Sequence, residues 1–276
     1  MKSTMKLIWD VISFPLLFVG MQLILGVMIS IPVAILVALG MVSFDSMNQW
    51  LVSIVGIPSF ALTLLITWLI LRKKWQEQQL WSAAFDRKSM LFVALGTIPI
   101  YFSVSFLLTL TRITEAFPEY YELMESMMGN SIFLDIVLVV ILAPLVEEVI
   151  FRGVVMKRLL DRGVRFPYAI AIPALIFGVI HMNVVQGIYA FVLGIILGLV
   201  YYWTKTLWAP ILMHLIFNGM GVFFSHVSAV LDIETASGSD PTLLLLTLGS
   251  LTLAVVLMYH VRRRSRLIDS TMHTDI

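Results

Sequence analysis

Long apolar stretches separated by short polar segments run along most of the chain. A helix of about 20 apolar residues is long enough to cross a bilayer. Stretches near that length or longer lie at 11–40, 51–71, 89–111, 131–151, 167–183, 184–203, 207–224 and 242–260. The pattern predicts an all-α fold, a polytopic integral membrane helical bundle of about eight transmembrane helices, in which residues 1–276 form a single membrane domain.

The composition supports this interpretation and excludes several other classes of protein. Hydrophobic residues make up 60% of the chain, whereas soluble domains contain roughly 45 to 50%. The 18 basic and 17 acidic residues nearly balance, so no basic surface points to nucleic acid, and the lipid bilayer is the expected partner. The absence of cysteine excludes disulfides, thiolate catalysis and cysteine-ligated metals.

The basic residues predict an orientation, because cytoplasmic loops collect lysine and arginine. If the N-terminus lies inside, 17 of the 18 basic residues fall on the inner side and only Arg112 lies outside. The outer segments are instead acidic, at 115–125 and 232–240. We therefore expect cytoplasmic N- and C-termini. The predicted location is the cytoplasmic membrane, in a bacterium.

Several polar residues interrupt the apolar stretches, at a cost of about 2.5 to 3.5 kcal/mol for each ionisable group on insertion scales. Glu148 and Arg152 are four residues apart, in the order that favours an intrahelical ion pair. Glu147 points about 100° away from Glu148 around the helix. It cannot pair with Arg152 equally well, so its carboxylate is available for another function. His214 and Asn218 share one helix face.

Counting residues from the basic helix ends places Glu147, His181 and His214 near the same depth in the cytoplasmic half of the bilayer. A carboxylate beside a histidine can activate water as a general base. A second histidine and an amide can stabilise an oxyanion. This set suits peptide-bond hydrolysis.

A catalytic metal is the competing interpretation, because two histidines and a carboxylate also bind zinc. Its ligands would be Glu147, His181 and His214, from three separate helices. The H-E-x-x-H pattern of many zinc proteases is missing. We favour water activation without a cofactor over a divalent metal such as zinc.

The polar residues also form three motifs, EEVIFR at 147–152, FGVIH at 177–181 and HLIFN at 214–218. In this order they resemble the EExxxR, FxxxH and HxxxN motifs of the CPBP intramembrane endopeptidases, which include the type II CAAX prenyl proteases and Abi-like proteins. The resemblance implies a core catalytic region at about 131–224 and a substrate that is a membrane-associated or lipid-modified polypeptide. Because family members have been described both as metalloproteases and as glutamate-dependent enzymes, it leaves the metal open.

The resemblance also implies a role for each motif residue. Glu147 would be the general base and His181 would help to hold the water. His214 and Asn218 would form the oxyanion site, and the pair of Glu148 and Arg152 would support the geometry.

Two other functions remain open at this point. Buried glutamate and histidine also form proton relays, so a proton-coupled transporter or channel is the alternative from another class. We find no inverted repeat of the kind such transporters carry. A catalytically silent family member that binds or scaffolds a partner is the third possibility. The oligomeric state is left open.

Three further positions carry minor expectations. Asp135 is expected near the outer headgroups, and His226 is expected to have no role. Gly194 and Gly198 form a G-x-x-x-G pattern, which predicts close packing of the sixth helix against a neighbour within the chain.

Overall fold

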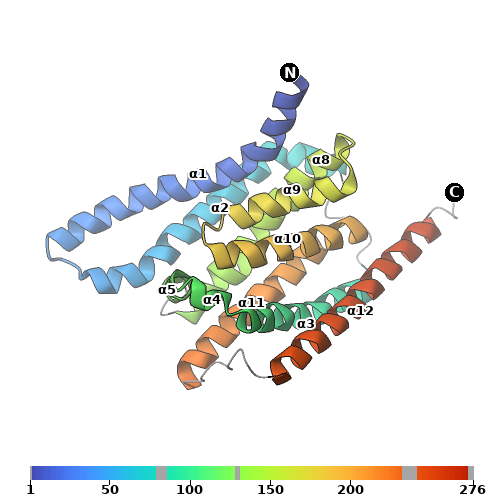
Figure 1. The fold of residues 1–276 in the computed structure, drawn as a ribbon. Helices are drawn as coiled ribbons and strands as arrows, with labels where there is room; N and C mark the ends of the chain where they lie inside the picture. The colour runs from blue at the N-terminus through green and yellow to red at the C-terminus, as the bar shows by residue number, and fades with distance from the viewer. Residues whose placement is uncertain (1, 79–85, 128–130, 232–240, 273–276) are drawn as a thin grey trace.

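The computed structural model describes residues 2–78, 86–127, 131–231 and 241–272, and within these ranges the ordered elements are all helices. The chain begins with α1 (Lys2–Ala38) and α2 (Phe44–Gln78), which lie side by side as a long hairpin (Figure 1). The next helices are α3 (Arg87–Thr111), α4 (Ile113–Ala116) and α5 (Glu119–Met127). After the segmented fourth stretch come α9 (Phe166–Val179), α10 (Val184–Thr204), α11 (Trp208–Leu231) and α12 (Pro241–Met272).

Six helices in the described ranges are long and apolar enough to cross a membrane. These spans are Met5–Ala38, Trp50–Lys73, Arg87–Thr111, Val184–Thr204, Trp208–Val227 and Pro241–Leu267. Many of their apolar side chains face outwards, as on α1, where Leu23, Val27 and Ile31 are each more than half exposed. The all-α membrane bundle predicted from the sequence is confirmed.

Two of the eight expected spans do not appear as full-length α-helices. The stretch expected at 167–183 is α9, which has 14 residues and is about 21 Å long at 1.5 Å per residue, shorter than the roughly 30 Å hydrocarbon core. It ends early because the chain turns at Met182, whose φ is 52°. The acidic residues expected outside at 232–240 lie beyond the described ranges.

The stretch expected at 131–151 is a longer helical rod in which α-helical and π-helical turns alternate. It consists of α6 (Ile132–Asp135), η1 (Ile136–Leu142), α7 (Ala143–Glu148), η2 (Val149–Met156) and α8 (Lys157–Asp161). Pro144 contributes to this irregularity, because a proline has no N–H to donate to the preceding turn. Single π-turns within α-helices are often found at functional sites.

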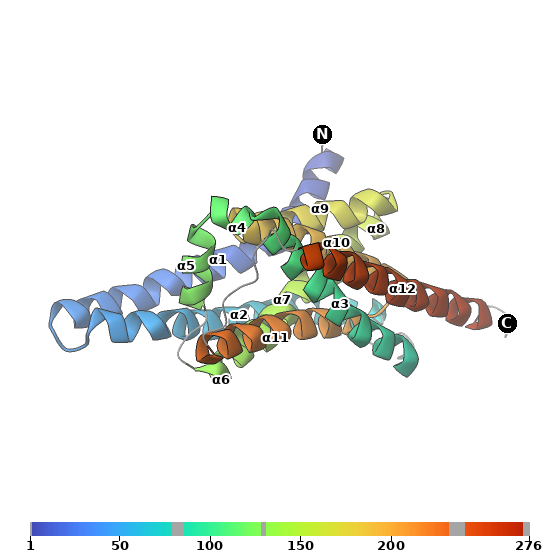
Figure 2. The same ribbon diagram turned by 60° about the horizontal axis from the view of Figure 1, so that its bottom comes forward.

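Two buried cores hold the bundle together, and the first of them contains the rod. One core joins residues of α1, α7, η2, α9 and α10, and the other joins residues of α3, α10, α11 and α12. Figure 2 shows α7 in the interior of the bundle, beside α11 and α2. The part of the rod that carries the two glutamates, α7 and η2, is therefore enclosed by other helices.

Close backbone contact joins α9 to α10. A Cβ atom on Gly178 would lie 2.7 Å from the carbonyl oxygen of Gly187, and one on Gly194 would lie 3.1 Å from Ala174. Gly198 meets Ile170 at 3.1 Å in the same way. The expected packing of the G-x-x-x-G helix against a neighbour within the chain is confirmed, and α9 is that neighbour.

Candidate active site

Glu148 and Arg152 form a buried ion pair inside the bundle. Arg152 is 1% exposed and Glu148 is fully buried. The Arg152 Nη1 atom donates a hydrogen bond to Glu148 Oε1 at 2.7 Å, and Nη2 donates to the carbonyl oxygen of Gly194 on α10 at 2.8 Å. The ion pair predicted from the spacing is confirmed, and it also fastens η2 to α10.

His214 brings α11 into the same cluster. Its Nδ1 atom lies 2.9 Å from Glu148 Oε1, which therefore interacts with both Arg152 and His214. A carboxylate that is paired with an arginine accepts hydrogen bonds, which favours the tautomer of His214 that donates from Nδ1. In a neutral imidazole this leaves Nε2 as an acceptor.

That second nitrogen faces the other glutamate. His214 Nε2 lies 3.7 Å from Glu147 Oε2, and both side chains are buried. This separation is too long for a direct hydrogen bond, but a water molecule can lie about 2.8 Å from each atom. A water donating one hydrogen to the carboxylate and one to the imidazole would direct its oxygen lone pairs away from both.

Phe177 of α9 lies between the charged groups and the second histidine. The guanidinium carbon of Arg152 lies 5.4 Å from the centre of the Phe177 ring. The same ring makes edge contacts with His214, at 5.8 Å between centroids, and with His181, at 4.8 Å. Phe177 thus contacts three members of the predicted site.

His181 lies in the turn that follows α9, and its side chain is partly buried. Its Nδ1 atom is 2.6 Å from the carbonyl oxygen of Phe177. Because a carbonyl can only accept, Nδ1 is the protonated nitrogen and Nε2 is the acceptor of the neutral ring. The turn thereby fixes the orientation of the imidazole next to Phe177.

Asn218 contacts a different part of the rod. Its Nδ2 atom donates to the carbonyl oxygen of Val139 at 2.9 Å. That carbonyl lacks the usual donors, because the Ala143 N–H bonds to Leu138 and Pro144 has no N–H. Asn218 supplies the missing hydrogen bond and joins α11 to η1, and its second amide hydrogen is not used by this bond.

The structure therefore joins five of the six predicted residues through a chain of contacts, and Asn218 extends the site one helical turn along α11. For a metal, the relevant donors are Glu147, His181 and His214. Among the described residues, no group of three or more histidine, aspartate or glutamate side chains is close enough together to hold one ion. The preference for water activation without a cofactor over a divalent metal stays a prediction, and the chemistry proposed below uses the side chains alone.

One buried polar pair was missed from the sequence. Asp135 was expected near the outer headgroups, but it is 1% exposed, and its Oδ2 atom lies 2.9 Å from Nε2 of His226 on α11. His226 was expected to have no role. The sequence did contain a signal that Asp135 needs a partner, because an acidic residue in an apolar stretch raises the free energy of membrane insertion. The spacing of residues does not identify a partner 91 residues away.

Comparison with known proteins places this site within a matched region. Residues 129–220 match the family model described as type II CAAX prenyl endopeptidase Rce1-like. The membrane-embedded CAAX protease MroQ of Staphylococcus aureus is 37% identical over 89 residues, which are 30% of this chain and 36% of that protein. The putative membrane peptidase YdiL of Bacillus subtilis is 32% identical over 78 residues, 28% of this chain and 32% of its own length. No solved structure matches significantly.

The chain thus spans about a third of the length of each of these curated relatives. The apolar helices and the bacterial membrane relatives support an integral bacterial membrane protein. The family resemblance read from the three motifs is confirmed over residues 129–220, which match the type II CAAX prenyl endopeptidases of the Rce1-like type.

Proposed function

We propose that the protein is an intramembrane endopeptidase that hydrolyses a peptide bond of a membrane-associated or lipid-modified polypeptide with a water molecule activated by glutamate and histidine. The observation that carries this proposal is the buried pair of Glu147 and His214, whose Oε2 and Nε2 atoms lie 3.7 Å apart within a helical bundle. A water molecule that donates one hydrogen to the carboxylate and one to the imidazole fits this separation.

In the proposed reaction, Glu147 acts as general base. It takes a proton from the water as the water oxygen attacks the carbonyl carbon of the scissile bond, which gives a tetrahedral intermediate. The intermediate collapses when the C–N bond breaks, and the protonated Glu147 returns its proton to the leaving amine. Water is consumed, and the products are a carboxylic acid, which keeps the second water proton, and an amine; transfer of that proton gives a carboxylate and an ammonium group.

The neighbouring residues would hold this geometry. Glu148 fixes the tautomer of His214 through Nδ1, and Arg152 balances the buried charge of Glu148. His181 lies beside the same Phe177 ring and would position the water or the substrate carbonyl. Asn218 would use its second amide hydrogen towards the oxyanion while its first holds Val139.

The substrate class follows from the surroundings of the site. Glu147 lies in a rod enclosed by apolar helices, so a substrate must reach it from the lipid phase or from the membrane boundary. The relatives are described as a CAAX protease and a membrane peptidase, which agrees with a substrate held at the membrane. We further propose that both termini and the open side of the site face the cytoplasm, from the distribution of basic residues.

The decisive experiment replaces the proposed base. Purified protein in proteoliposomes is offered a set of fluorogenic membrane peptides, with and without a C-terminal prenyl group. Glu147→Gln is expected to lower the cleavage rate by about 100-fold to 10,000-fold, the usual contribution of a general base. Glu115→Gln is the matched control, because Glu115 is an exposed acid in α4, far along the chain from the site.

Three outcomes decide the proposal. Loss of cleavage in Glu147→Gln, with unchanged thermal unfolding and an active Glu115→Gln, supports it. A Glu147→Gln protein with activity near that of the wild type refutes the assigned base. A wild-type protein that binds peptides but cleaves none favours the silent or transporter alternatives. Metal analysis of active protein, with chelator and metal-restoration controls, separates the two kinds of water activation.

A further inference from the structure

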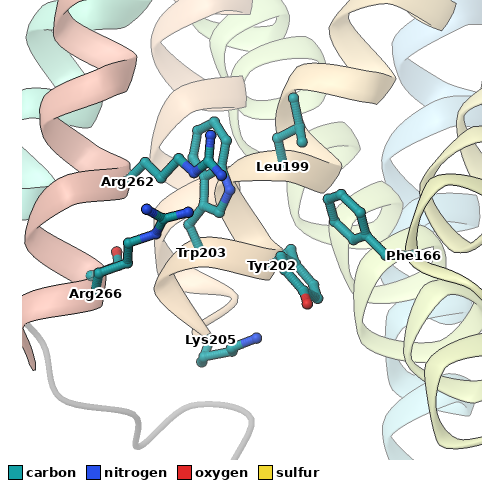
Figure 3. Close-up of a pocket in the computed structure, with 8 residues that line it drawn as sticks. Phe166, Leu199, Tyr202, Trp203, Lys205, Arg262 and Arg266 are labelled. Atoms are coloured by element: carbon teal, nitrogen blue, oxygen red, sulfur yellow. The ribbon is translucent and has the colours of Figure 1, made fainter. Parts of the chain in front are cut away.

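A basic and aromatic pocket lies away from the proposed active site, at the end of the bundle where α10 ends. It has a volume of about 290 Å³. Its lining comes from α9, α10 and α12, and consists of Phe166, Leu199, Tyr202, Trp203, Lys205, Arg262, Ser265 and Arg266. Figure 3 shows Arg262 and Arg266 reaching in from α12, opposite Phe166.

The lining carries three cationic side chains and no acidic one. Aromatic faces hold two of these cations. The guanidinium of Arg262 lies 5.9 Å from the ring centre of Trp203, and the Lys205 ammonium lies 3.9 Å from that of Tyr202. The nearby carboxylate of Asp86 pairs with Arg264 instead, at 2.8 Å. Among the residues whose side chains the structure describes, neither Arg262 nor Arg266 forms a salt bridge to a carboxylate.

A second hollow of about 270 Å³ adjoins the first, because Arg262 and Arg266 line both. It adds Arg263, Tyr259 and Leu267, and the last two are each more than half exposed. The arrangement therefore combines a concentrated positive charge with an apolar outer surface along the C-terminal part of α12. Arginine forks match the oxygens of a phosphate group.

We propose that this pocket binds the phosphate headgroup of an anionic phospholipid from the leaflet on the basic side of the membrane. Basic pockets between transmembrane helices on the cytoplasmic side are suited to such headgroups. The volume of the pocket lies just below the range of about 300 to 1,000 Å³ that is typical of sites for whole small molecules. The pocket therefore has room for the headgroup of a lipid, and the acyl chains would lie along the apolar face of α12. A bound lipid would also fasten α12 to α9 and α10.

The test measures lipid selectivity of the full-length protein in detergent by native mass spectrometry. Phosphatidylglycerol, cardiolipin and phosphatidylcholine are added separately at equal concentration, and inorganic phosphate is added in a fourth sample. The Arg262→Gln/Arg266→Gln variant is compared with Arg72→Gln/Lys73→Gln, which removes two exposed basic residues from α2. Thermal unfolding of each sample is followed in parallel.

The wild type and the α2 variant are expected to retain phosphatidylglycerol or cardiolipin over phosphatidylcholine, and to unfold at a higher temperature with the anionic lipid. The α12 variant is expected to bind the anionic lipid about 30-fold more weakly, since each basic residue near a charged leaflet contributes about 1 kcal/mol. The Arg262→Lys/Arg266→Lys variant keeps the charge and is expected to retain the preference for anionic over neutral lipid. It replaces the glutamine variant in the comparison if that variant does not fold.

Equal binding of the neutral and anionic lipids by the wild type would overturn the proposal. So would an equal loss of binding in the α12 and α2 variants, because it would indicate a general surface attraction. Stabilisation by inorganic phosphate that matches the effect of the lipid would assign the pocket to a free anion and reject a lipid site.

Discussion

Removing the guanidinium of Arg152 is the most informative test of how the proposed site is held together. Arg152→Gln keeps a polar side chain of similar length but leaves the buried Glu148 without its cation. Breaking a buried ion pair by removing one partner costs about 3 to 5 kcal/mol. At roughly 2 to 4 °C per kcal/mol for a chain near this size, the unfolding temperature should fall by about 6 to 20 °C.

Two comparisons isolate the pair. Arg158→Gln removes an arginine from the same rod where the side chain is 26% exposed and bonds to Asp10, so a cost below about 1 kcal/mol is expected. Glu148→Gln and the double variant complete a cycle in which the coupling energy should reach about 0.5 to 3 kcal/mol.

The assay is thermal unfolding of the purified variants in one detergent, followed by intrinsic fluorescence, with protein concentration and lipid content held constant. If Arg152→Gln unfolds within 1 kcal/mol of the wild type (on the roughly 2 to 4 °C scale above), or the cycle shows no coupling, the ion pair does not organise the site and the argument for its supporting role is wrong.

Two further predictions concern contacts between helices. Arg264 donates to Asp86 and lowers the pKa of that carboxyl well below its ordinary value, so the pair stabilises the protein fully above about pH 4 and this contribution is lost as the pH falls through the lowered pKa. The difference in unfolding temperature between the wild type and Asp86→Asn should therefore be present at pH 7, should shrink in acid, and would be contradicted by a constant difference. Gly178→Ala should destabilise the protein by about 1 to 3 kcal/mol, because the new Cβ would meet the Gly187 carbonyl at 2.7 Å. Gly249→Ala in α12 has open space and should be neutral or stabilising, and equal effects at the two positions would contradict the close contact.

Sequence patterns were sufficient for the features that depend on local spacing. The apolar stretches predicted the membrane bundle. The bilayer core holds no water, so a chain that crosses it must satisfy its backbone hydrogen bonds internally, as an α-helix does. The spacing of four between Glu148 and Arg152 predicted their ion pair. The three motifs predicted the family of residues 129–220.

Other features depend on how distant helices meet. The sequence suggested that Glu147, His181 and His214 share a level, but only the packing of α11 against the rod shows that His214 joins both glutamates while His181 is linked through Phe177. In the same way, the bond from Asn218 to Val139 depends on two segments 79 residues apart.

What the chain alone determined, then, is where helices form and which polar residues need a partner, because helical periodicity and the cost of burying charge act locally. What the tertiary structure decided is which partner each residue finds. The helix spacing predicted that Arg152 pairs with Glu148 and not with Glu147. No spacing predicted that Asp135 pairs with His226. Such pairings are set by the close packing of α9 on α10 and of α11 on η1, which no spacing along the sequence records.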